Sequence, residues 1–101
     1  MLGLMSVGDR VPSFDGLPGA ELIERGLADL EAGRGSVEAL LVSIGAPRLR
    51  ALGIEVASPL PFPEHGLYEL LAAEDPDSAH SRYNALIRRL VSFEDAAEGR
   101  A

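Results

Sequence analysis

A group of polar side chains near the start of the last predicted helix is the first candidate for chemistry in this sequence. His80, Asn84 and Arg88 are spaced four residues apart and would share one face of a helix. Arg82 and Tyr83 lie in the same turns, and we refer to all five as the His80 cluster. An imidazole, an amide and guanidinium groups can bind a carboxylate or phosphate, and histidine can carry a proton. The cluster is therefore either a small-ligand or enzyme site or a solvated helix face.

Other arrangements of catalytic or metal-binding residues are incomplete. His65 and Glu69 are four residues apart and could supply two metal ligands, but the chain has only two histidines and no cysteine. The serines lack a G-x-S-x-G turn, and no glycine-rich loop carries the GK[ST] sequence that binds phosphates. We assign no catalytic residue, no metal and no cofactor, and the sequence favours a non-enzymatic protein.

Composition and charge restrict the class of partner. The chain has 101 residues and a net charge of −7, and all nine basic residues are arginine. Binding to nucleic acid or anionic lipid depends on clustered positive charge, so this balance argues against both. The apolar opening at residues 1–7 is short and is followed closely by Asp9 and Arg10, so we do not expect a secretory signal. No later apolar run is long enough to span a bilayer. We expect a cytoplasmic protein with no membrane segment.

One arrangement would still allow DNA binding. Residues 37–54 place two short predicted helices around a turn at Gly45, as in a helix-turn-helix regulator. The second of these helices offers only Arg48 and Arg50 for phosphate contacts, and Gly53 would fall at its end. A regulator of this kind is the less favoured alternative.

The composition predicts an all-α fold. Alanine and leucine supply 30 residues, whereas valine and isoleucine supply 10 and threonine is absent, which favours helices over strands. Ser36 is a helix cap, Gly45 a helix end and Pro47 a first-turn residue by type. Gly26 weakens its helix unless a neighbouring helix packs close to it. Apolar spacing predicts a compact bundle of about five helices, three longer and two short: 17–32, 37–44, 47–52, 64–74 and 76–97.

Prolines at positions 59, 61 and 63 predict an extended crossover over residues 54–63. This crossover could expose Phe62 and form a docking groove with Leu60 and Tyr68, but packing on the core is the favoured interpretation. Before the helices, residues 1–16 are expected to form an irregular arm. Residues 17–98 are expected to form a single helical domain.

The last predicted helix carries an apolar seam whose members step by 4, 3, 4, 3 and 4 residues: Ala79, Tyr83, Leu86, Leu90, Phe93 and Ala97. We expect this seam to pack inside the domain. Helix 64–74 is too short to cover the far end of the seam, so an exposed patch around Phe93 would favour a homodimer. The function that the sequence favours is a small acidic protein–protein interaction module or subunit that forms a homodimer or binds a protein partner.

Overall fold

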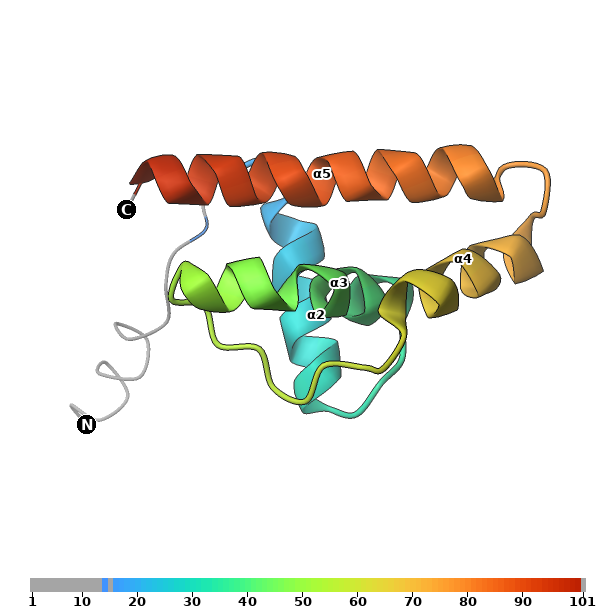
Figure 1. Ribbon diagram of the computed structural model, residues 1–101, viewed down its shortest axis with the longest axis horizontal. Helices are drawn as coiled ribbons and strands as arrows, with labels where there is room; N and C mark the ends of the chain where they lie inside the picture. Colours follow the sequence, from blue (N-terminus) through green and yellow to red (C-terminus); the bar gives the residue numbers. More distant parts are fainter. Residues whose placement is uncertain (1–13, 15, 101) are drawn as a thin grey trace.

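The computed structural model describes residues 14 and 16–100, and within this range the chain is a compact all-α fold of four helices with no strand. In Figure 1, α5 runs along one side of the molecule, and the other three helices lie on the same side of it; α3 and α4 pack against it. The expected arm at residues 1–16 lies outside the described residues except for Phe14 and Gly16. The helices are α2 (Ala20–Glu31), α3 (Val37–Ala51), α4 (Pro63–Glu74) and α5 (Ala79–Arg100).

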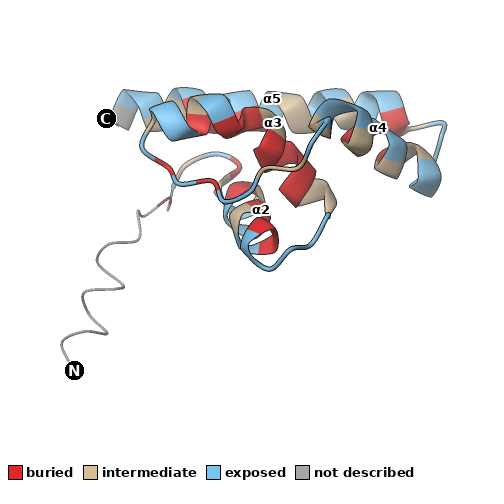
Figure 2. Ribbon diagram, turned by 60° about the horizontal axis from the view of Figure 1, so that its bottom comes forward, coloured by how far each residue is buried: buried red, intermediate tan, exposed pale blue. Residues whose placement is uncertain are grey.

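Helix α3 is the central element of the fold. It packs against each of the other three helices, and Figure 2 shows buried residues along much of its length. A helix that is apolar on several sides belongs in the interior of a domain, because each of those sides must be removed from water. Its buried apolar residues are Ala39, Leu40, Leu41, Val42, Ala46 and Leu49.

The prediction of two short helices at 37–44 and 47–52 is wrong, because the chain forms the single helix α3 there. At Gly45, a Cβ atom would lie 2.8 Å from the Leu90 side chain of α5, so this glycine permits close helix packing instead of ending the helix. Pro47 lies inside α3. Its ring removes one backbone donor, and the helix changes direction in this region (Figure 1). The helix-turn-helix at 37–54 is therefore not formed.

The crossing of α2 and α3 depends on Gly26. A Cβ atom at this position would meet the backbone carbonyl oxygen of Glu38 and would lie 2.5 Å from the Val42 side chain. The two helix backbones can approach this closely only because glycine has no side chain. The expectation that a neighbouring helix packs close to Gly26 is confirmed.

Some helix ends follow the sequence signals and others depart from them. Helix α2 begins at Ala20 and not at residue 17, directly after Gly19, which adopts the left-handed conformation. Ser36 caps α3, and its hydroxyl oxygen accepts a hydrogen bond from the Ala39 backbone N–H at 3.1 Å. Helix α4 begins at Pro63, one residue before its predicted start. Helix α5 begins at Ala79 instead of residue 76, because the Asp75 side chain accepts hydrogen bonds from residues 77 and 78 and closes a separate turn.

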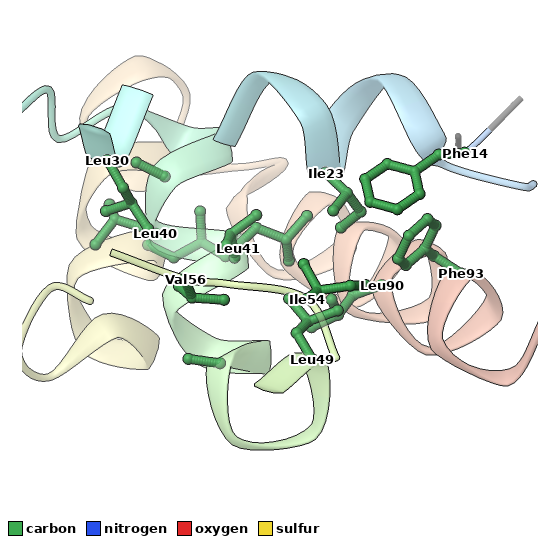
Figure 3. Packing of buried hydrophobic residues seen from close by; sticks show 14 of the residues in the cluster. Phe14, Ile23, Leu30, Leu40, Leu41, Leu49, Ile54, Val56, Leu90 and Phe93 are labelled. Carbon is green, nitrogen blue, oxygen red and sulfur yellow. The ribbon is translucent and has the colours of Figure 1, made fainter. Parts of the chain in front are cut away.

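The apolar seam of α5 packs inside the fold, as expected. Ala79, Leu90 and Phe93 are buried, and the Phe93 ring meets the Phe14 ring edge-on with centroids 5.3 Å apart (Figure 3). The expected exposed patch around Phe93 is wrong, because Phe14 and the core cover this end of the seam. Nothing exposed at Phe93 therefore favours a homodimer. In the described part of the chain, no helix is both long and apolar enough to cross a membrane.

Replacement of Leu90 by alanine should lower the free energy of unfolding by about 2–5 kcal/mol, because it removes buried methyl groups and leaves a cavity at the α3–α5 contact. The neighbouring Val91, which is 41% exposed, is the control, and Val91→Ala should change stability by less than about 0.5 kcal/mol. Chemical denaturation measures both. Equal losses for the two variants would contradict this packing.

Gly26→Ala should destabilise the protein by about 1–3 kcal/mol, although alanine is the better helix former, because the new methyl group overlaps α3. Gly99 in α5 has open space around its Cα, so Gly99→Ala should stabilise by up to about 1 kcal/mol. Thermal and denaturant unfolding of the pair give the comparison. A stabilising Gly26→Ala would mean that the helices do not cross there.

Candidate functional site

The structure places three members of the His80 cluster along the exposed surface of α5. Asn84 Nδ2 lies 3.2 Å from His80 Nε2, and Arg88 is also exposed. His80 and Asn84 are both exposed to solvent and both belong to α5. His80, Asn84 and Arg88 thus form a polar surface that is exposed to solvent.

The other two members of the cluster are engaged elsewhere. Arg82 Nη1 lies 2.9 Å from Glu74 Oε1, which joins the end of α4 to α5. The Tyr83 ring is half-buried and packs edge-on against Tyr68 at 6.1 Å between centroids. Burial, and secondly the charge of Glu64, raise the pKa of Tyr83. The five side chains are thus divided between a solvated face and the α4–α5 contact.

The remaining candidates from the sequence also have defined contacts. His65 Nε2 lies 3.1 Å from Glu69 Oε2 on the exposed face of α4. Within residues 14 and 16–100, no group of three or more histidine, aspartate or glutamate side chains could hold a metal ion. Arg50 donates a 2.7 Å hydrogen bond to the backbone oxygen of Val56, and Arg48 pairs with α5. The two arginines are therefore each engaged with other groups of the protein and do not form a joint phosphate-binding pair.

The partners of Arg48 include one buried carboxyl group. Arg48 Nη2 lies 2.8 Å from Asp95 Oδ1 and 2.7 Å from Glu98 Oε1. Arg48 Nη1 lies 3.5 Å from Oε1 of Glu94, a residue that is only 4% exposed. Glu94 Oε2 has no hydrogen-bond partner in the described residues and lies beside Gly45. Burial raises the pKa of Glu94, and the charge of Arg48 opposes this change. Sequence reasoning missed the burial of Glu94, because a charged residue next to an apolar seam is ordinarily solvated.

A second buried carboxyl group fixes the link between α2 and α3. Asp29 accepts a 2.6 Å hydrogen bond from the Ser36 hydroxyl and a 3.0 Å hydrogen bond from Arg34 Nε. The Ser36 hydrogen bond, followed by that of Arg34, lowers the pKa of Asp29. Periodicity places Asp29 off the apolar stripe of α2, yet the structure buries it because these two partners satisfy its oxygens.

The most exposed large apolar side chain of the described residues lies in the crossover. Phe62 is 81% exposed and adopts the left-handed conformation, with φ 49° and ψ 51°, between Pro61 and Pro63. Ser58, four residues earlier, also has a positive φ of 44°. This conformation is uncommon for residues other than glycine and is an outlier for a bulky side chain. The crossover therefore holds an aromatic ring in solvent at the expense of backbone strain.

Specific contacts on both sides of Ser58 fix this segment to α3. Ile54 and Val56 are buried, and Arg50 binds the Val56 carbonyl oxygen. Further along, the Leu60 backbone N–H donates to the buried Ser43 hydroxyl at 2.9 Å. These contacts place the crossover on the core, as the sequence favours. They leave Phe62 pointing away from it.

A groove lies where all four helices converge. Its lining comes from α2, the start of α3, the second half of α4 and the first half of α5, and its volume is about 620 Å³. Four half-buried apolar side chains form its floor: Leu22, Val37, Leu70 and Leu86. Glu38, Glu74 and Arg82 also line it, so one member of the His80 cluster belongs to this groove. Arg88 instead lines a separate hollow beside the N-terminus of α2.

Comparison with known proteins finds no matching family model, no matching curated protein and no matching solved structure.

Asp29→Asn should lower the free energy of unfolding at pH 7, because the lowered pKa of Asp29 means that the fold favours its charged form. This stabilisation is present above the ordinary pKa of 3.8 and is lost as the pH falls through the lower pKa of the folded protein. The variant and the wild type should therefore converge in acid. Denaturant unfolding across this pH range, with the exposed Asp77→Asn as control, measures the difference. A gap that is independent of pH would contradict the assignment.

Proposed function

We propose that this protein is a cytoplasmic, non-enzymatic protein–protein interaction module and that Phe62 is its principal contact residue. The observation that carries this proposal is a phenylalanine ring that is 81% exposed in a left-handed backbone conformation. Exposure of an aromatic side chain and backbone strain are both unfavourable in an isolated protein. Strained residues concentrate at functional sites, and aromatic anchors dominate the energetics of protein interfaces.

The rigidity of the crossover supports the same role. Pro61 and Pro63 restrict the backbone on either side of Phe62, and the Leu60–Ser43 hydrogen bond fixes the segment to α3. A preorganised side chain loses less conformational entropy when it binds. The partner that suits Phe62 is a protein with an apolar pocket for one aromatic ring, and a homodimer is the alternative that light scattering tests.

Phe62→Gly should separate stability from binding. Glycine accepts a positive φ without strain, so the variant should gain about 1 kcal/mol in free energy of unfolding. The same variant should lose the partner, because the aromatic ring is gone. Ser58→Gly is the matched control, since it also relieves a positive φ but leaves Phe62 in place, and it should keep the partner.

The measurement is affinity capture from cells of the source organism with wild type, Phe62→Gly and Ser58→Gly, combined with light scattering of each purified protein. A protein or dimer retained by wild type and Ser58→Gly but lost by Phe62→Gly supports the proposal. Equal capture and equal mass for all three proteins would rule Phe62 out as the contact residue.

A further inference from the structure

The groove between the four helices is a second candidate binding surface, and Phe62 does not line it. Its apolar floor is built from one side chain of each helix, namely Leu22, Val37, Leu70 and Leu86, and all four remain partly accessible. An α-helix with its side chains is about 10 Å across, and its apolar face projects residues at intervals of three and four positions. Several separated leucine and valine side chains, as in this floor, can pack against the apolar face of such a helix.

The charges around the groove specify which kind of helix it suits. Glu38 and Glu74 line it, and Arg82 is the one basic residue among the lining side chains of the described chain. The Arg82 guanidinium is already paired with Glu74 at 2.9 Å, so the groove carries a net negative charge from Glu38. The whole chain, at −7, adds to this negative potential.

From this floor and this charge, we infer that the groove binds a basic amphipathic helix of a protein partner. The apolar face of that helix packs on Leu22, Val37, Leu70 and Leu86, as in other complexes where a helix lies in a groove. Its lysine or arginine residues lie opposite Glu38. A second copy of this chain is disfavoured as the occupant, because both molecules carry the same negative charge.

The test uses a fluorescein-labelled 18-residue peptide of leucine and lysine with the apolar residues on one helical face. A peptide of identical composition, scrambled so that no apolar face forms, is its control. Fluorescence anisotropy with the full-length protein should show binding of the amphipathic peptide at least about tenfold tighter than the scrambled one. Phe62→Gly should leave this affinity unchanged, because Phe62 does not line the groove, so this test and that of the proposed function fail separately.

Two pairs of variants locate the site. Glu38→Arg should weaken binding by about tenfold, whereas Glu69→Arg, which makes the same charge change on the exposed face of α4, should weaken it by less than about twofold. Leu70→Gln removes part of the floor and should abolish binding, while Val91→Gln on the exposed face of α5 should not. Circular dichroism checks that each variant is folded, and the glutamate pair decides the outcome if Leu70→Gln unfolds.

Equal losses for Glu38→Arg and Glu69→Arg would overturn the inference, because binding would then reflect overall charge alone. Equal affinity for the scrambled peptide would overturn it for the same reason. A wild-type dimer in light scattering that Glu38→Arg or Leu70→Gln converts to a monomer would also overturn it, since the occupant of the groove would then be a second copy.

Discussion

The close crossing of α2 and α3 at Gly26 is the contact on which the rest of the fold depends. Glycine allows the α2 backbone to lie against the Glu38 carbonyl group and the Val42 side chain, which brings α3 under cover on one side. Asp29 then holds the short link between the two helices through Ser36 and Arg34. With α3 fixed in this way, α4 and α5 complete its burial, and the groove forms where all four helices meet.

Local sequence signals predicted the class of fold and most helix positions, because apolar spacing and capping residues act over a few residues. The Ser36 cap and the start of α4 within one residue are examples. The same signals failed at Gly45, where close packing against Leu90 of α5 outweighs the local preference to end the helix, and at Pro47, which lies inside α3 and does not begin a new helix. No local pattern contains that information, since Leu90 is 45 positions further along the chain than Gly45.

The candidate site was predictable to a smaller extent. The three prolines predicted an extended crossover, but the position of Phe62 depends on the hydrogen bond between Leu60 and Ser43, 17 residues apart. The four-residue spacing of His80 and Asn84 did bring these side chains into contact. Arg82 lies on the same helix but does not join His80 and Asn84, because it pairs with Glu74 of α4. Contacts between helices, and not spacing within one, decided which polar groups meet.

The edge-on contact of Tyr68 with Tyr83 makes the α4–α5 interface optically distinct. The chain has no tryptophan and only these two tyrosines, so near-ultraviolet tyrosine signals originate at this one interface. The second aromatic pair, the buried Phe14 with Phe93, absorbs at shorter wavelengths and lies nearer the opposite end of α5. The protein therefore carries a natural spectroscopic reporter for the docking of α4 on α5, separate from the packing around Phe14.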